Sequence, residues 1–381
     1  MRKHWIDNLR WVTVLLVMFY HVIYFYNNKG VFGGIGGFGP YPDLPQYQDV
    51  VMYILYPWFM PLLFLLAGIS ARYALDKYPA RDWFKARTRK LLVPATIGLF
   101  VFQWMTGYFN TQVTAVATGN NPFGSMPDTL PAGIQGFIKY FAYSFSGTGP
   151  LWFVQDLWLF SLILLLVRWL DGKDRLWNAC GRAFSGRAAI VWILLLGVLF
   201  WAGEQLIIQN PRPETADGLY NLYKPLFYLI PFLMGWFVFS HDGVQDALGR
   251  AWSPLFSCAW SAGIVLIVTT FGQDNTSPQY LGSPLNCLYG WLMCLAMIAW
   301  FRARFDRTSA FAGYMTRSSY GLYIVHYLVV AAFGYMMKMY TQLPPFALYA
   351  ILTVAVFTIS PLLYEILRRI PVLRWCALGE R

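Results

Sequence analysis

The sequence predicts an all-α polytopic membrane protein with about ten transmembrane helices and both termini in the cytoplasm. Of its 381 residues, 57% are hydrophobic and only 12% are charged, whereas soluble domains carry roughly 25% charged residues. Apolar stretches long enough to cross a bilayer recur along the whole chain. Lys and Arg concentrate in alternate connections, which places both termini on the cytoplasmic side by the positive-inside rule.

The expected spans follow one another with short connections. They lie near 10–26, 50–74, 91–110, 151–170, 188–208, 223–240, 253–271, 284–302, 319–338 and 345–367. Because the sequence has no internal repeat and no separate soluble domain, we predict one transmembrane domain over residues 1–381. No small-residue cleavage site follows the first span, which is therefore expected to stay as a helix.

Three connections have a distinct composition. Residues 27–48 are rich in Gly and Pro and are expected to form an outer loop or lid. Residues 72–90 form the strongest basic run between two spans. Residues 111–134 are expected to form a polar loop, and 135–146 an amphipathic helix on the outer surface.

Composition also excludes several classes of function. The formal net charge of +11 follows the membrane topology, so we predict no nucleic-acid partner. The five cysteines include no Cys-x-x-Cys pair, and the four histidines show no His-x-x-x-His spacing. We therefore expect neither a disulfide framework nor a metal site.

The first span carries the arrangement on which the functional hypothesis depends. Arg10 and His21 are eleven residues apart, so on a helix they lie within about 20° of one face and roughly 16 Å apart along the axis. Asp7 falls near the same stripe and can hold the Arg10 guanidinium. An ionisable residue inside a span is a functional candidate, and the alternative is a buried His bonded to a neighbouring helix.

The ninth span contains a second polar face. Ser319, Tyr323 and His326 are spaced i, i+4 and i+7, which puts a hydroxyl, a phenol and an imidazole on one side of a helix. Such a face is costly against lipid and is a candidate functional surface. The alternative is a ladder of interhelical hydrogen bonds that holds the bundle together.

Two other spans contribute single candidates. In the fourth span Trp152 and Asp156 share a face, and Asp156 can be a partner of His21 or of a substrate hydroxyl; the alternative is an interfacial carboxylate in water. Arg72 ends the second span. It can bind an anionic group from beneath the bundle, or it can be a positive-inside residue that extends toward the interface.

Four segments form a joint pattern over most of the chain: Asp7 and Arg10 followed by His21, Phe64 to Gly68 followed by Arg72, Leu151-Trp152-Phe153, and Ser319 to His326. Together they resemble the acyltransferase-3 family of bacterial membrane proteins, which acylate cell-surface or periplasmic carbohydrate. The ending from Tyr364 to Pro371 looks like the branch that succinylates osmoregulated periplasmic glucans. One departure is the pair Gln155 and Asp156, which replaces the Glu-Glu-Gln cluster of another branch.

The resemblance implies a multi-pass enzyme of the bacterial inner membrane. Its expected reaction transfers a succinyl or acetyl group from cytoplasmic acyl-coenzyme A to a hydroxyl of a glucan or other surface carbohydrate. We predict His21 as the general base, because a neutral imidazole can reside at mid-membrane depth. Arg10 and Arg72 are expected to bind coenzyme phosphates. The other predicted catalytic residues are Asp156 and His326, and Ser319, Tyr323 and Trp152 are predicted to bind the acyl donor.

Two alternatives remain open at this point. Within the same chemistry, an acyl-histidine intermediate can relay the group in place of direct attack. The alternative from another class is a transporter or exporter of an anionic or glycan solute, which predicts discontinuous helices in two related halves. The expected partners are the acyl donor, the carbohydrate acceptor and membrane lipid. The sequence leaves open whether the protein forms a homodimer.

Overall fold

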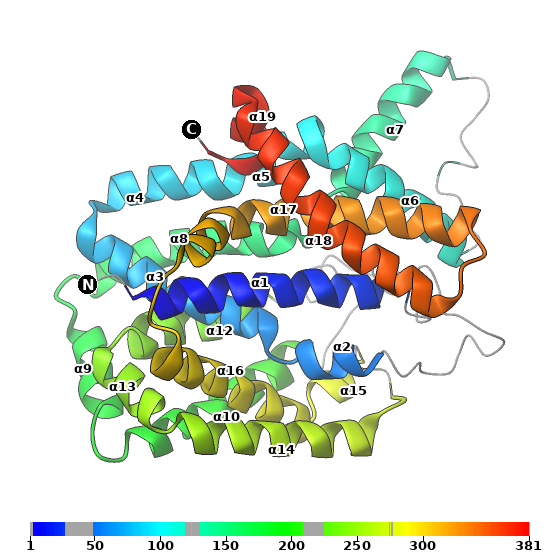
Figure 1. Cartoon of the computed structure of the whole chain (residues 1–381). Helices are drawn as coiled ribbons and strands as arrows, with labels where there is room; N and C mark the ends of the chain where they lie inside the picture. The colour runs from blue at the N-terminus through cyan, green and yellow to red at the C-terminus, as the bar shows by residue number, and fades with distance from the viewer. Residues whose placement is uncertain are drawn as a thin grey trace. The chain divides into compact units, whose positions relative to one another are not determined.

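The computed structural model describes residues 3–26, 49–118, 123, 130–208, 225–273, 275 and 277–380 (Figure 1). Within these ranges the regular elements are helices, and none is a strand. The predicted all-α class is therefore confirmed. The outer loop expected at 27–48 lies outside the described residues, as do residues 119–122 and 124–129 of the expected polar loop.

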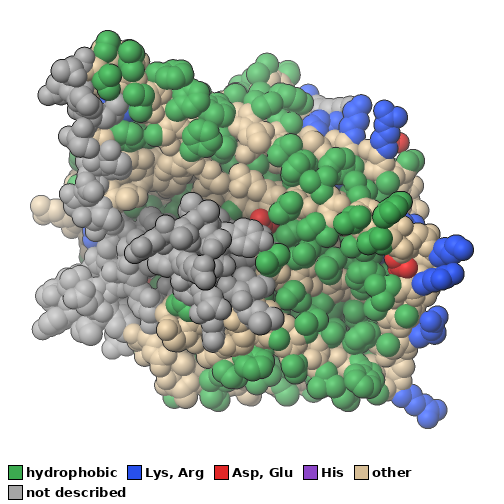
Figure 2. Space-filling view, turned by 180° about the vertical axis from the view of Figure 1, so that it is seen from behind, with side chains coloured by type: hydrophobic (Ala, Val, Ile, Leu, Met, Phe, Trp, Pro, Cys, Tyr) green, Lys and Arg blue, Asp and Glu red, His purple; other side chains and the backbone are tan. Residues whose placement is uncertain are grey.

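Eight helices of the described chain are long and apolar enough to cross a membrane: His4–Phe25, Val50–Lys77, Ala80–Val116, Gly149–Leu170, Trp252–Thr270, Pro284–Arg304, Ala310–Tyr340 and Pro345–Arg369. A ninth results if the pair Arg175–Phe184 and Ala189–Gln205, bent by 117°, counts as one span. The shorter apolar helix Leu226–Phe239 covers the remaining expected stretch. Hydrophobic side chains also lie across much of the described surface in Figure 2. The predicted polytopic membrane protein is thus confirmed.

The chain folds into two compact units, each built from segments far apart in the sequence. Unit 1 comprises Met1–Thr13, Met52–Lys85 and Leu159–Thr316, and unit 2 comprises Val14–Val51, Ala86–Trp158 and Arg317–Arg381. The boundaries fall inside five helices: α1 (His4–Phe25), α2 (Val50–Leu55), α4 (Ala80–Arg87), α8 (Trp152–Leu170) and α17 (Ala310–Tyr340). The expectation of one domain over 1–381 stays a prediction.

Unit 1 contains a helical layer centred on α16 (Pro284–Arg304), which packs against α14 (Trp252–Thr270), α13 (Asp242–Arg250) and α10 (Ala189–Ile208) (Figure 1). Its other elements are α3 (Phe59–Lys77), α9 (Arg175–Phe184), α12 (Pro225–Met234), the π-helical segment η6 (Gly235–Phe239), α15 (Pro278–Leu281) and most of α2 (Val50–Leu55).

Small residues bring α3 close to α12 and η6. A Cβ atom at Gly68 would collide with the backbone of Phe232, and one at Gly235 would collide with the backbone of Leu65. Close backbone approach at small residues is the usual way in which membrane helices gain packing contacts. This contact positions Arg72, one turn after Gly68, near the end of η6.

Unit 2 contains the remaining elements: η3 (Thr88–Leu92), α5 (Val93–Ala95), η4 (Leu99–Gln103), α6 (Trp104–Thr118), α7 (Ala132–Ser146), the 3₁₀ turn η5 (Gly149–Leu151), α18 (Pro345–Arg369) and α19 (Pro371–Leu378). The π-helical segments η3 and η4 lie on either side of Pro94, which cannot donate to the helical ladder. Helix α7 contains the helix expected at 135–146.

The basic run at 72–90 is mostly helical, whereas the sequence interpretation treated it as a connection between spans. Helix α3 continues to Lys77 and α4 begins at Ala80, so the break comprises only two residues. Tyr78 ends α3 in an extended conformation, with φ −120° and ψ 147°. The physical reason is Pro79, because a proline disfavours helical geometry in the residue before it.

Candidate active site

Two imidazoles meet inside unit 2. His21 lies on α1 and the fully buried His326 lies on α17. The His326 Nε2 atom is 3.2 Å from the His21 Nδ1 atom, and the ring planes are tilted by 53°. We call these two residues the histidine pair. Their contact brings together groups that can exchange protons within membrane-spanning helices.

Backbone carbonyls determine which ring nitrogens carry hydrogen when both rings are neutral. The His326 Nδ1 atom lies 2.8 Å from the Tyr323 carbonyl oxygen and 3.2 Å from that of Leu322. A carbonyl only accepts, so His326 Nδ1 donates and His326 Nε2 accepts. The His21 Nδ1 atom faces this acceptor and also the Val17 carbonyl at 2.9 Å. We therefore assign the hydrogen of His21 to Nδ1, which leaves its Nε2 atom as an acceptor.

Tyrosine rings surround His21. The Tyr327 ring centroid lies 5.2 Å from that of His21 with the planes at 78°, and the Tyr20 centroid lies at 5.5 Å with the planes at 84°. Both tyrosines are buried, whereas His21 is only half-buried. Edge-on aromatic contacts of this kind hold a ring in a defined orientation. His21 is consequently oriented on several sides and keeps some accessible surface.

Tyr323 connects α17 to the start of α8. Its hydroxyl donates to the Pro150 carbonyl oxygen at 2.6 Å, in η5. Ser319 is buried one turn earlier on α17. Of the predicted face formed by Ser319, Tyr323 and His326, two side chains therefore bond to other helical elements. This surface therefore contains the interhelical hydrogen bonds of the alternative interpretation, and its functional role stays a prediction.

Trp152 and Asp156 lie in the first turns of α8. The Trp152 ring contacts Phe153, whose centroid is 5.4 Å from that of Tyr323. The Asp156 Oδ2 atom is buried and has no hydrogen-bond partner among the described residues. No hydrogen bond joins Asp156 to His21 in the described part of the chain, so a contact of Asp156 with a substrate hydroxyl stays a prediction.

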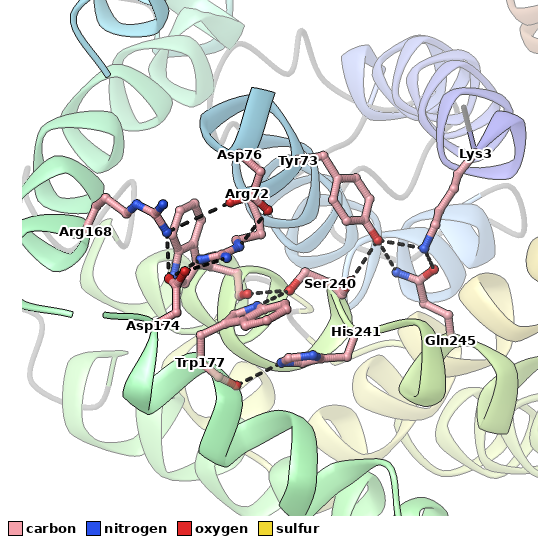
Figure 3. A network of polar contacts seen from close by, with 11 residues as sticks. Lys3, Arg72, Tyr73, Asp76, Arg168, Asp174, Trp177, Ser240, His241 and Gln245 are labelled. Carbon is pink, nitrogen blue, oxygen red and sulfur yellow. Dashed lines mark hydrogen bonds and ion pairs between the residues drawn. The ribbon is translucent and has the colours of Figure 1, made fainter. Parts of the chain in front are cut away.

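A second polar centre lies in unit 1 (Figure 3). The nearly buried Arg72 donates from Nε to Asp76 at 3.0 Å and from both Nη atoms to Asp174, at 2.7 and 3.2 Å. Arg168 donates at 2.6 Å to Asp174 Oδ1, the oxygen that also accepts the 2.7 Å bond from Arg72. The Arg72 guanidinium also lies 4.1 Å from the Trp177 ring centroid. We call these five residues the arginine network.

The charges of the arginine network act on its central carboxylate. The hydrogen bond from Arg72 holds the pKa of Asp174 below its ordinary value, and the positive charges of Arg72 and Arg168 act in the same direction. Burial of the carboxyl opposes this shift. Asp174 therefore stays ionised and keeps its two arginine partners at neutral pH.

His241 extends the arginine network on the side of Trp177. The two rings stack with centroids 4.0 Å apart, and His241 Nε2 lies 3.0 Å from the Trp177 carbonyl oxygen. Burial lowers the pKa of His241, and the charge of Arg72 adds to this effect. Hydrogen bonds to backbone and the nearby Asp242 carboxylate oppose the shift. His241 is therefore held as a neutral ring.

Arg10 has a more open environment. Its Nη2 atom donates to the Ser70 hydroxyl at 2.6 Å, and its Nη1 atom donates to Asp7 at 3.3 Å. The predicted contact between Asp7 and Arg10 is confirmed. The Arg10 side chain is 35% exposed, whereas that of Arg72 is 5% exposed. Of the two predicted phosphate ligands, Arg10 is the more accessible.

A comparison with protein families decides the class of protein. The model of the acyltransferase-3 family, described as an acyltransferase domain, matches residues 3–365. The chain belongs to this acyltransferase family. No curated protein and no solved structure matches the chain. The matched range includes every site residue predicted from the sequence, and the molecule is a multi-pass membrane acyltransferase.

The structure adds functional candidates of this acyltransferase that the sequence interpretation missed. Asp174 and Trp177 engage Arg72, although they are about a hundred residues away along the chain. The Asp-Gly-Lys-Asp segment ending at Asp174 is a turn signal that could have marked a helix start, since Asp174 has a positive φ of 52°. In the described ranges no group of three His, Cys, Asp or Glu residues could hold a metal ion, and the expected absence of a metal stays a prediction.

Proposed function

We propose that this membrane acyltransferase moves a succinyl or acetyl group from acyl-coenzyme A to a hydroxyl of a periplasmic glucan or another surface carbohydrate. His21 is the general base in this proposal. The observation that supports this assignment is the direction of the hydrogen bonds at the histidine pair. His21 donates from Nδ1, which leaves the lone pair of its Nε2 atom available. The setting is the bacterial inner membrane, with the donor on the cytoplasmic side.

The reaction needs a base for its first step and an acid for its second. His21 Nε2 takes the proton of the acceptor hydroxyl as its oxygen attacks the thioester carbonyl carbon. The tetrahedral intermediate then collapses, the carbon–sulfur bond breaks, and the coenzyme thiolate takes the proton back from His21. The products are a carbohydrate ester and free coenzyme A, and His21 returns to its neutral form.

His326 supports this cycle by holding His21 in the required tautomer. Its Nε2 atom accepts from His21 Nδ1, and its own Nδ1 hydrogen is occupied by backbone carbonyls. When His21 becomes an imidazolium, its Nδ1–H bond to His326 becomes charge-assisted and stronger. His326 therefore stabilises the protonated base in the same geometry in which it orients the neutral one.

The donor requires cationic groups for its phosphates. Arg10 suits this role because its guanidinium is partly exposed, with one hydrogen bond to Asp7 and one to the uncharged Ser70 hydroxyl. Arg72 is engaged by two carboxylates, which favours a role in joining the ends of helices. Its contact with a coenzyme phosphate stays a prediction.

Trp152, Ser319 and Tyr323 are proposed to line the path of the donor arm. Tyr323 supports the Trp152 segment through the neighbouring Pro150 carbonyl. Asp156 is proposed to accept a hydrogen bond from the sugar, because its buried Oδ2 atom has no partner among the described residues. Such an acceptor favours a hydroxyl-rich molecule over an apolar one.

The decisive experiment measures both halves of the reaction with purified protein in lipid vesicles. Isotope-labelled succinyl- or acetyl-coenzyme A is supplied with glucan, free coenzyme A is quantified by chromatography, and glucan esters are quantified by mass spectrometry. We expect equal amounts of the two products. The His21→Ala variant should lower their formation by about a thousandfold, the usual range for loss of a general base.

The matched control is His4→Ala, which removes an imidazole from the same helix. Normal product formation by His21→Ala would refute the catalytic assignment. Glucan movement without release of coenzyme A would favour the transporter alternative. A labelled acyl-protein formed without acceptor, and lost in His21→Ala, would identify the acyl-histidine relay as the route.

A further inference from the structure

A groove of about 690 Å³ lies on unit 1 between α10, α14 and α16. Its lining is almost wholly apolar and comes from Ile190, Leu194, Gly197, Val198, Trp201, Ala251, Pro254, Leu255, Cys258, Pro284, Leu288, Trp291 and Leu292. Several of these side chains are exposed, including Val198 at 59% and Leu288 at 52%. Because helices that span a membrane are surrounded by lipid hydrocarbon, the groove opens toward the lipid.

The dimensions of the groove match one leaflet of a bilayer. It follows α10 from Ile190 to Trp201, and eleven residues of helix extend about 16 Å. The hydrocarbon depth of one leaflet is about 15 Å, half of the bilayer core. A single extended acyl chain thus has the length and the chemistry to occupy this groove.

One end of the groove is marked by positive charge. Arg250 directly precedes Ala251, which lines the groove, and Arg187 lies three residues before Ile190. Both arginines are exposed. The turn before α10 lies beside the start of α13, since a Cβ atom at Gly243 would meet Ser185. Cationic side chains at the membrane surface attract anionic lipid headgroups.

We propose that this groove is a binding site for an anionic phospholipid. One acyl chain lies along α10 over the floor formed by α16, and the phosphate of the headgroup pairs with Arg187 and Arg250. The carbohydrate esterification proposed above does not use these residues, so the lipid site stands independently of that reaction. Bound lipid fills a groove that would otherwise leave α10 and α14 poorly packed.

The test uses phosphatidylglycerol with a photoactivatable diazirine on one acyl chain. Full-length protein in mixed lipid–detergent micelles is irradiated, and the labelled peptides are identified by mass spectrometry. We expect saturable labelling of the groove segments of α10 and α14. Unlabelled phosphatidylglycerol should compete at least tenfold better than phosphatidylcholine, because two arginines favour the anionic headgroup.

Two pairs of variants separate this site from general lipid contact. Val198→Trp fills the groove and should reduce groove labelling about tenfold, whereas Val268→Trp, at an exposed position of α14 outside the groove, should not. The double variant Arg187→Gln and Arg250→Gln should remove the headgroup preference, and Arg81→Gln is its control. Non-saturable labelling, labelling unchanged in Val198→Trp, or crosslinks to a second protein copy in the groove would overturn the proposal.

Discussion

The buried polar groups of the histidine pair and of the arginine network are compensated by different kinds of partner. In the described residues no carboxylate hydrogen-bonds to either imidazole of the pair, and the rings satisfy each other and backbone carbonyls. In the arginine network, Arg72 is permanently charged and is compensated by Asp76 and Asp174. A charged group removed from water needs such partners, whereas a neutral imidazole does not.

This difference assigns different tasks to the two centres. A neutral ring with an available lone pair can take up a proton and release it, which is what acyl transfer to a hydroxyl requires. A guanidinium between carboxylates and an indole cannot change its charge. Its contacts with Asp174 and Trp177 join α3 to α9, and Arg168 of α8 binds the same Asp174. We therefore expect variants of the first centre to affect turnover and variants of the second to affect stability.

The largest effect after loss of His21 itself is expected at His326. His326→Leu removes the acceptor of the His21 Nδ1 hydrogen, so turnover should fall about a hundredfold. His326→Gln offers an amide oxygen in a similar place and should recover about a tenth of the wild-type rate. The measurement is the rate of coenzyme A release as a function of pH, because a changed tautomer partner shifts the profile. Equal rates for the Leu and Gln variants would contradict the orienting role.

Arg72→Met tests the second centre. Removal of the buried guanidinium leaves Asp174 with Arg168 as its remaining cationic partner and Asp76 without its bond to Arg72, and we expect a loss of about 2 kcal/mol in unfolding free energy. This expected loss is smaller than the loss usual for breaking a buried ion pair, because the Asp76 and Asp174 carboxylates both retain contact with solvent. The measurement is thermal unfolding in detergent, together with the KM for the acyl donor.

Arg72→Lys is the companion variant, since it keeps the charge and loses the forked geometry. It should be destabilised almost as much as Arg72→Met. An unchanged KM in both variants agrees with a purely architectural role. A KM raised tenfold or more in folded Arg72→Met would instead support the predicted contact with a coenzyme phosphate.

Much of the fold could be predicted from the sequence, because apolar stretches of spanning length leave the backbone no alternative to helix in a bilayer. Local spacing also placed Ser319, Tyr323 and His326 correctly on one helix. Pairings across the chain could not be obtained this way. His326 lies 305 residues from His21, and only the packing of α17 against α1 within unit 2 brings the rings together.

The arginine network shows the same limit more clearly. The place of Arg72 at the expected cytoplasmic end of a span predicts either an anion ligand or a positive-inside residue, and neither interpretation contains the distant partner Asp174. The turn that presents Asp174 lies in a segment that composition describes only as basic. Close contact of α3 with η6, at Gly68 and Gly235, is also a property of packing that no local pattern contains.

Arg10→Gln sharpens the contrast between an accessible and a compensated arginine. If Arg10 binds a donor phosphate, the substitution should raise the KM for acyl-coenzyme A about fivefold, a reduced effect because the group is partly exposed to water. Stability should change little, since an exposed ion pair contributes little. Kinetics with the intact donor and with its pantetheine fragment provide the measurement, and only the intact donor should lose affinity. Equal changes for both substrates would argue against a phosphate contact.

The smallest expected effect concerns pH and the stability of the arginine network. Because the pKa of His241 is lowered in the folded state, the unfolded chain binds a proton first as the pH falls below the ordinary value of about 6.5. The neutral ring therefore makes its full contribution to the free energy of unfolding above that pH. This contribution is lost as the pH falls through the pKa of His241 in the folded state.

His241→Gln removes this titration and can keep the hydrogen bond to the Trp177 carbonyl. Between pH 7.5 and 5.5, the unfolding midpoint of the variant should consequently fall less than that of the wild type. His4→Gln is the matched control and should follow the wild-type curve. If His241→Gln shows the same pH dependence as the wild type, the acid sensitivity originates elsewhere, and the buried histidine pair becomes the group to examine by the same measurement.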